Sequence, residues 1–241
     1  MEFTLADHSF SMPVGRIEYR HLGPMSFKEF LYEISPELLV YLDELHWDQA
    51  IPQAAHLKLL DKLREYVFVG GMPEAVKVYQ ESNSLQDVQE VHRSINETYQ
   101  DDFAKYARRK DLVLLQKIFR TIPSFLGQKI KYSNISREHR AVEVRSAIDL
   151  LVKARVFHEV FASSCSGLPL DAQINTKVLK LISLDVGLLN YQSGLDWLAI
   201  SSMSEQQLIN EGMLAEQLVG QQLLADPEMK KKPQLIYWLR E

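Results

Sequence analysis

Five basic side chains between residues 129 and 145 form the strongest candidate binding site in this sequence. They are Lys129, Lys131, Arg137, Arg140 and Arg145. Lysine and arginine neutralise the phosphates of DNA, and arginine also pairs with the edge of guanine. We expect the three arginines on one helix, where about 100° per residue spreads them over an arc of roughly 140°. The alternative is a solvated helix face in a module that packs only against protein.

The charges of the chain are unevenly distributed along the sequence. Residues 104–145 contain eleven Lys or Arg and three Asp or Glu, whereas the rest of the chain contains 16 and 29, within a formal net charge of −5. Such segregation indicates a surface that faces a polyanion within an otherwise acidic body. Double-stranded DNA is the partner that this pattern predicts.

Other residues that could do chemistry favour a structural interpretation. Glu97 and Asp101 lie one helical turn apart and could share a metal ion, but no third ligand is obvious, and a solvated acidic face is the better interpretation. The seven histidines show no H-x-x-x-H pattern of the kind that binds zinc. Cys165 lies in a serine-rich loop without a basic neighbour, so we do not expect a nucleophile there. We therefore predict no catalytic residue and no metal site.

Gly70 and Gly71 precede Pro73 and Glu74 in the stretch GGMPEAV. A glycine pair before a helix N-terminus can cradle a phosphate. Glu74 in the first turn would repel an anion, so a helix that stops and restarts is the favoured interpretation, with the glycines serving positive φ and close packing.

Helical periodicity dominates the elements that must position these residues. We expect helices over 26–34, 36–45, 54–69, 84–109, 111–122 and 204–225, with another that starts at Pro73. A short helix near 130, a longer helix through the arginines and a strand pair would then follow in the order of a winged helix-turn-helix. The predicted fold class is mainly α with minor β, in which a winged-helix-like module is followed by a partial α/β unit.

Four motifs in one order give the chain a resemblance to a known family. They are SMPVGRIEYRHLGPMSFKEFL, VGGMPEAV, LISLDVGLL and GMLAEQLVGQQLL followed by IYWLRE. This order resembles prokaryotic AAA-type ATPases in which the ATPase core is followed by a C-terminal domain of unknown function. The resemblance covers about residues 2 to 241. It implies that residues 1–35 are the tail of the ATPase core, where Arg16 could reach a nucleotide phosphate in a full ATPase module. The alternative is a loop arginine that pairs with a local acid such as Glu18.

The phosphate-binding loop of such ATPases is absent from the sequence. None of the ten glycines is followed by lysine, so no G-x-x-x-x-G-K-[ST] motif exists. Because that lysine and the backbone around it hold the β- and γ-phosphates, we expect no ATP hydrolysis by the chain as written. ATP and Mg²⁺ would be cofactors of full-length relatives only.

The last part of the family resembles the restriction-endonuclease fold. Glu216 in LAEQLV corresponds to the helix glutamate of that fold, but the remaining carboxylate and lysine are not found before Glu241. The order of the expected elements and the resemblance together predict four parts: a core remnant (1–35), a helical connector (36–110), a winged-helix-like module (111–175) and a truncated endonuclease-like unit (176–241).

Together, these features predict a non-catalytic C-terminal fragment of an AAA-type ATPase that contributes DNA binding. The alternatives are an ATPase subunit whose nucleotide-binding core is encoded upstream, and a protein-interaction adaptor. Exposed strand edges also favour a homo-oligomer. The single cysteine and the absence of an apolar run of about 18 residues favour a cytoplasmic protein with no membrane segment.

Overall fold

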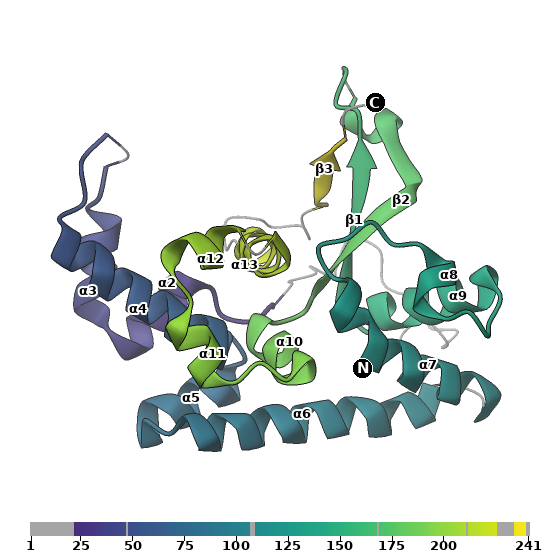
Figure 1. Cartoon of the computed structure of the whole chain (residues 1–241), viewed down its shortest axis with the longest axis horizontal. Coiled ribbons are helices and arrows are strands. Elements are labelled where there is room, and N and C mark those ends of the chain that lie inside the picture. The colour runs from purple at the N-terminus through teal and green to yellow at the C-terminus, as the bar shows by residue number, and fades with distance from the viewer. Residues whose placement is uncertain are drawn as a thin grey trace, which may run out of the picture. The chain divides into compact units, whose positions relative to one another are not determined.

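The computed structural model describes residues 22–46, 48–106, 109–167, 169–210, 212–225 and 234–239. Helices dominate these residues, and three strands form one small sheet (Figure 1). The prediction of a mainly α fold with minor β is therefore confirmed. Arg16 and the strand expected near it lie outside the described residues.

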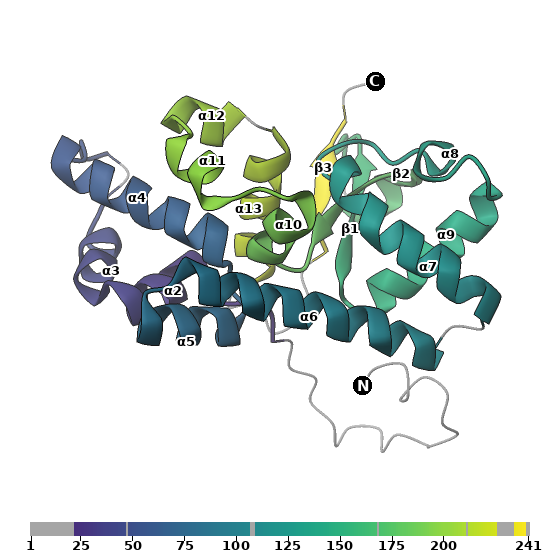
Figure 2. The ribbon, with the colours of Figure 1, turned by 60° about the horizontal axis from the view of Figure 1, so that its bottom comes forward.

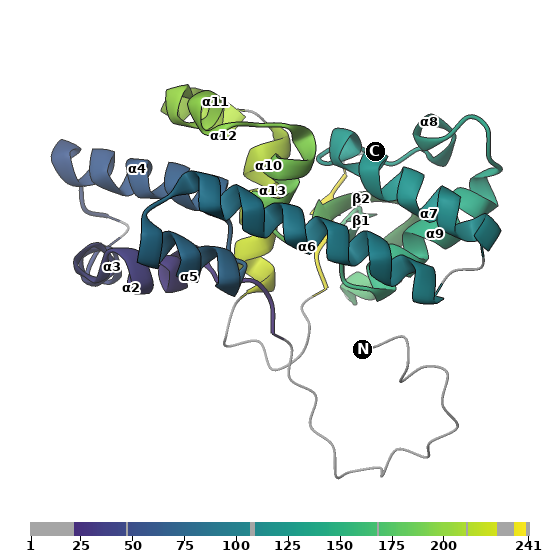
Figure 3. The same cartoon turned by 90° about the horizontal axis from the view of Figure 1, so that it is seen from below.

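The described residues divide into two compact units. The helical unit consists of residues 23–97 and 185–225, and the strand unit consists of residues 98–184 and 234–239. Helix α6 (Leu85–Tyr106) contributes residues to both units, and Figure 3 shows it as one uninterrupted helix. The predicted division into four parts groups the residues differently from these two units, and it stays a prediction.

The helical unit contains eight further helices among its described residues. They are α2 (Phe27–Ile34), α3 (Pro36–Asp43), α4 (Gln53–Val69), α5 (Pro73–Ser82), α10 (Val186–Ser193), α11 (Trp197–Ser202), α12 (Glu205–Asn210) and α13 (Gly212–Leu224). The single helix expected over 204–225 is thus two helices, α12 and α13.

Local sequence signals explain where several of these helices begin. The Ser26 hydroxyl accepts a hydrogen bond from the Glu29 N–H, and the Glu29 carboxylate accepts one from the Ser26 N–H at 2.7 Å. This reciprocal capping box starts α2 where the sequence predicts it. Ser84 similarly accepts from the Asp87 N–H at the start of α6, and Pro73 occupies the first turn of α5.

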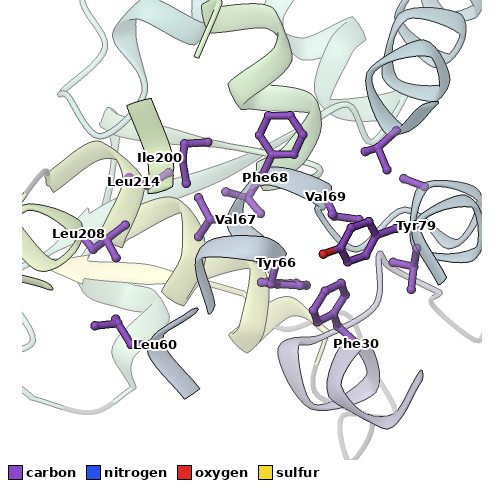
Figure 4. Packing of buried hydrophobic residues seen from close by; sticks show 14 residues of the cluster. Phe30, Leu60, Tyr66, Val67, Phe68, Val69, Tyr79, Ile200, Leu208 and Leu214 are labelled. Carbon is purple, nitrogen blue, oxygen red and sulfur yellow. The ribbon is translucent and has the colours of Figure 1, made fainter. Parts of the chain in front are cut away.

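The core of the helical unit gathers apolar side chains from all parts of its sequence (Figure 4). The Tyr66 ring lies 5.4 Å from that of Phe30 in an edge-to-face arrangement, and the Phe68 ring lies 5.7 Å from that of Trp197. Edge-to-face pairs of this kind add to the stabilisation from burial. The core therefore joins α2 and α11 to α4, across long separations in sequence.

The strand unit combines three α-helices, two 3₁₀ turns and the sheet with the end of α6. Its elements are α7 (Arg109–Thr121), η1 (Ile122–Phe125), α8 (Tyr132–Ile135), α9 (Ala141–Lys153), β1 (Phe157–Ser163), η2 (Leu170–Gln173), β2 (Ile174–Ser183) and β3 (Ile236–Trp238). The strand order is β2-β1-β3. β1 pairs antiparallel with β2 and parallel with β3, and a bulge interrupts the β1–β2 register after Phe161.

Helices α7 and α9 pack side by side in the strand unit (Figure 2). Phe119 of α7 is buried and contacts Phe103 of α6 and Phe157 of β1, with ring centroids 5.2 Å and 6.3 Å apart. Ile118 and Ile148 are also fully buried. An apolar core between the helices and the sheet therefore fixes α9 against β1.

Candidate functional site

Lys129 and Lys131 lie on an extended segment that is held by the sheet. Between them Ile130 is buried, and its N–H donates a hydrogen bond to the Leu179 carbonyl of β2 at 2.8 Å. Both lysines are exposed.

Arg137 and Arg140 lie in the loop that precedes α9. The expectation that they share one helix with Arg145 is wrong, because α9 begins at Ala141 and Arg140 has an extended backbone. The Glu143 carboxylate accepts a hydrogen bond from the Arg140 N–H at 2.9 Å and thereby caps the helix from inside. The arginine side chains of the loop are exposed.

Arg145 lies on the exposed face of α9. The opposite face is buried through Val144, Ala147, Ile148 and Leu151. Val142, one turn before Arg145, is 75% exposed. Single exposed apolar side chains of this kind are common on protein surfaces.

None of the five basic residues forms an ion pair with a described residue of the chain. In the same region Lys117 does form one, with Glu138 at 2.5 Å, and its hydrogen bond and charge hold the pKa of the Glu138 carboxyl below its usual value. Burial raises the pKa of Tyr132 on α8, and the charge of Arg145 opposes that shift. The positive charges of Lys129, Lys131, Arg137, Arg140 and Arg145 thus remain available to an external anion.

The charges of the chain separate by unit. Residues 98–184 of the strand unit contain 15 Lys or Arg and 8 Asp or Glu. Residues 23–97 and 185–225 of the helical unit contain 6 and 18. The basic surface therefore belongs to the unit that contains the sheet.

A buried polar centre in the helical unit was not foreseen from the sequence. Asp185 is fully buried, and its carboxylate accepts hydrogen bonds from the N–H groups of Gly71 (2.6 Å) and Leu188 (3.0 Å) and from the amide of Gln221 (3.0 Å). Burial raises the pKa of Asp185, while these donors and the charge of His92 oppose the shift. The position of Asp185 after an apolar strand signals only its local role, which is to cap the N-terminus of α10.

Gly70 and Gly71 form the turn that this aspartate holds. Gly70 ends α4 with φ of +75°, so the predicted helix stop and restart is confirmed. A Cβ on Gly71 would lie 2.1 Å from the Met25 carbonyl oxygen, and one on Gly70 would lie 2.1 Å from the Asp185 carboxylate. The glycines therefore permit close packing, and they leave no space for a phosphate.

Two further polar side chains, Tyr66 and His92, lie near this polar centre and form hydrogen bonds of their own. The Tyr66 hydroxyl donates to the Met25 carbonyl at 2.7 Å and accepts from the amides of Gln221 and Gln222. Burial lowers the pKa of His92, whose Nε2 lies 2.9 Å from the Val69 carbonyl oxygen. Because Asp185 is inaccessible to solvent, we assign its hydrogen bonds a role in the stability of the helical unit.

The remaining sequence candidates lie on helices α6 and α13. Glu216 is exposed on α13. Asp102 contacts Lys105 at 2.5 Å and Glu97 contacts Arg93 at 3.2 Å on α6. Within the described ranges no three His, Cys, Asp or Glu side chains lie together in a way that could hold a metal ion.

Comparison with known proteins gives one match. Residues 60–199, more than half of the chain, match the family model described as Domain of unknown function (DUF8612). The chain belongs to the DUF8612 family. No curated protein matches it, and no solved structure does.

The part of the chain that matches DUF8612 includes the glycine turn, Asp185 and all five basic residues, whereas Glu216 lies beyond it. The family description names no activity and no ligand, so the resemblance to AAA-type ATPases stays a prediction. Among the helices that the structure describes, none has the length and apolar character needed to cross a bilayer.

Proposed function

We propose that the strand unit of this DUF8612 chain is a winged-helix-like module that binds double-stranded DNA. The observation that carries the proposal is the set of five exposed basic side chains at 129–145 that make no ion pair with described residues. Non-specific DNA binding depends chiefly on such contacts to phosphates.

The order of elements supports the winged-helix assignment. Helix α7 is followed by the segment 129–131, which bonds to β2, then by α8 and α9, and finally by the antiparallel pair β1 and β2. In a helix-turn-helix protein the second helix of the motif enters the major groove. Helix α9 takes that position here.

The exposed face of α9 suits such a role. Arg145 can reach guanine or a phosphate, and Val142 can contact a thymine methyl group. Arg137 and Arg140 precede the helix, and Lys129 and Lys131 lie on the segment bound to β2, where they would contact the backbone of the duplex. Phosphate contacts position a protein on DNA, and contacts to base edges provide sequence preference.

The larger setting that we propose is an AAA-type ATPase in which this chain is the C-terminal, non-catalytic part. Its support is the order of the four motifs in the sequence. In that setting ATP and Mg²⁺ would be bound by the ATPase core, near the segment that contains Arg16. The endonuclease-like end, with Glu216, and a homo-oligomeric assembly belong to the same proposal.

Fluorescence anisotropy with a labelled duplex at about 50, 100 and 200 mM salt tests DNA binding. If all five side chains contact phosphates, the affinity should fall about 500-fold between the lowest and highest salt. The triple variant Arg137→Ala/Arg140→Ala/Arg145→Ala should lower the slope of log K against log salt by about 2 to 3.

The matched control is the triple variant Lys58→Ala/Lys77→Ala/Arg93→Ala, which removes three exposed basic residues of the helical unit. It should leave the slope unchanged. Equal effects of the two triple variants would show that DNA binding depends on the overall charge of the protein and not on Arg137, Arg140 and Arg145. No binding at about 50 mM salt by folded protein would refute the proposal in favour of a protein-interaction adaptor.

A further inference from the structure

The helical unit contains a cavity of about 370 Å³ that neither the buried polar centre nor the basic surface uses. Five of its helices contribute to the wall: α2, α3, α4, α12 and α13. Its apolar lining includes Phe27, Leu42, Leu60, Leu63, Leu208 and Leu218. Figure 4 shows Leu60, Leu208 and Leu214 of this wall within the packed core.

The size and lining of the cavity suit a small molecule with an apolar body. Pockets for small ligands have volumes of about 300–1,000 Å³ and mostly apolar walls with few polar groups. A cavity lined by leucine side chains holds water poorly, because water finds no hydrogen-bond partners there. An apolar ligand would displace this water and bury the apolar lining of the cavity.

Among the described residues that line the cavity, only two are polar, and they form a pair. The His56 Nε2 lies 3.1 Å from the Glu205 carboxylate, and the side chains are 39% and 48% exposed. They therefore form an accessible polar edge beside an apolar interior. A guest with an apolar body and one polar head can satisfy both regions at once.

The net charge of the helical unit favours a positively charged head. Residues 185–225, which include α12 and α13, contain no Lys or Arg, and the helical unit carries a net charge of −12. A negative field of this kind raises the local concentration of cations. An ammonium group can donate to the Glu205 carboxylate, and hydrogen bonds to a charged group are stronger than neutral ones, whereas a carboxylate or phosphate head would be repelled.

We propose that this cavity binds small hydrophobic monocations, with the apolar body among the leucines and the cationic head at Glu205. The proposal is independent of DNA binding, because its residues all belong to the helical unit. Alkylamines and arylalkylamines are the chemical class that fits.

Isothermal titration calorimetry of the full chain with three ligands of one shape tests the proposal. The ligands are 4-phenylbutylamine, 4-phenylbutanol and 4-phenylbutyrate, which carry a positive, a neutral and a negative head. The amine should bind about tenfold more tightly than the alcohol, and the carboxylate should bind most weakly, since a charge-assisted hydrogen bond is about twice as strong as a neutral one.

Two variants locate the binding. Glu205→Gln should weaken the amine about tenfold and leave the alcohol unchanged. Ala215→Phe, which adds volume to the lining of the cavity, should abolish binding of all three ligands. The matched control is Glu74→Gln, an exposed glutamate in the first turn of α5 that does not line the cavity, and it should change nothing.

Several results would overturn the proposal. Equal affinities for the amine and the alcohol, or an amine affinity that survives Glu205→Gln, would exclude recognition of the cation. Equal binding of all three ligands that Ala215→Phe abolishes would reassign the cavity to an uncharged apolar guest, such as a helix of a partner protein. Absence of binding by any ligand to folded protein, with circular dichroism as the check on folding, would exclude the site.

Discussion

Gly71 and Gly212 are two glycines of the helical unit whose surroundings differ. A Cβ on Gly71 would lie 2.1 Å from the Met25 carbonyl oxygen, whereas one on Gly212 would have no atom within 4 Å. Neither glycine has positive φ. Because neither glycine needs a backbone conformation that favours glycine, replacing each with alanine tests the effect of close packing alone.

Gly71→Ala should destabilise the protein by about 1–3 kcal/mol, because overpacking forces the backbone to shift. Gly212→Ala should be neutral or stabilising by about 0.4–1 kcal/mol, since it reduces only the entropy of the unfolded chain. Urea unfolding of both variants and wild type measures the difference. Equal stabilities would mean that the contact between Gly71 and Met25 is loose.

His92 should make the stability of the helical unit depend on pH. Burial lowers the pKa of His92 from its ordinary value of 6.5, so the folded state binds fewer protons than the unfolded state just below that pH. The contribution of His92 is therefore complete above about pH 6.5 and is lost as the pH falls. The raised pKa of Asp185 acts with the opposite sign, since its contribution is lost as the pH rises.

The variant His92→Gln tests this prediction, because glutamine keeps a donor for the Val69 carbonyl but does not titrate. Between pH 7.5 and 5.5, wild type should lose stability relative to the variant in urea unfolding. The control is His46→Gln, which changes an exposed histidine. Parallel curves for wild type and His92→Gln would contradict the prediction.

Residue patterns predicted some of these roles and missed others. The glycine pair before Pro73 was sufficient to predict the turn, because positive φ and a helix start are local properties. The burial of Asp185 was not predictable, since Gly71 and Gln221, which satisfy its carboxylate, are distant in sequence. No single-sequence signal reports that kind of pairing.

Helix α9 begins later than the sequence suggested because its N-terminus is capped by Glu143, a residue of the helix itself. No serine, threonine, asparagine or aspartate lies at residue 140, and the Glu143 side chain accepts from the Arg140 N–H instead. Glu143→Ala should therefore cost about 0.5–1 kcal/mol of stability. Glu143→Gln, which keeps an acceptor, should cost less in the same urea unfolding experiment, and equal costs would show that the cap contributes nothing.

Long amphipathic helices and the strand pair β1–β2 were predictable, whereas the parallel pairing of β3 was not. Helices α4 and α6 follow an apolar period that local sequence shows directly. The parallel pairing of β3 with β1 joins Ile236 to Phe161, and strand partners so far apart in sequence leave no local signature. The basic residues were therefore found in sequence, but the segment that holds Lys129 and Lys131 against β2 required the structure.

At the scale of the whole molecule, the two units alternate along the sequence, since β3 belongs to the strand unit although it follows the helical unit. The helical unit stops at residue 97 and resumes at residue 185. The excess of basic residues at 104–145 anticipated part of this division, because those residues all belong to the strand unit. The sequence did not predict that residues 185–225 belong to the helical unit, because this depends on the packing of α10 against α4.

Because each unit has its own core, a core substitution should loosen one unit more than the other. Ile118 is fully buried in the strand unit, and Val76 is buried in the helical unit. Truncating Ile118 to alanine leaves a cavity that costs about 2–5 kcal/mol, and truncating the smaller Val76 leaves a smaller cavity at a lower cost. In hydrogen exchange with mass spectrometry, Ile118→Ala should reduce protection mainly in α7, α9 and β1, and Val76→Ala mainly in α4, α5 and α10. Equal loss of protection throughout both units in each variant would show that α6 couples them into one cooperative structure.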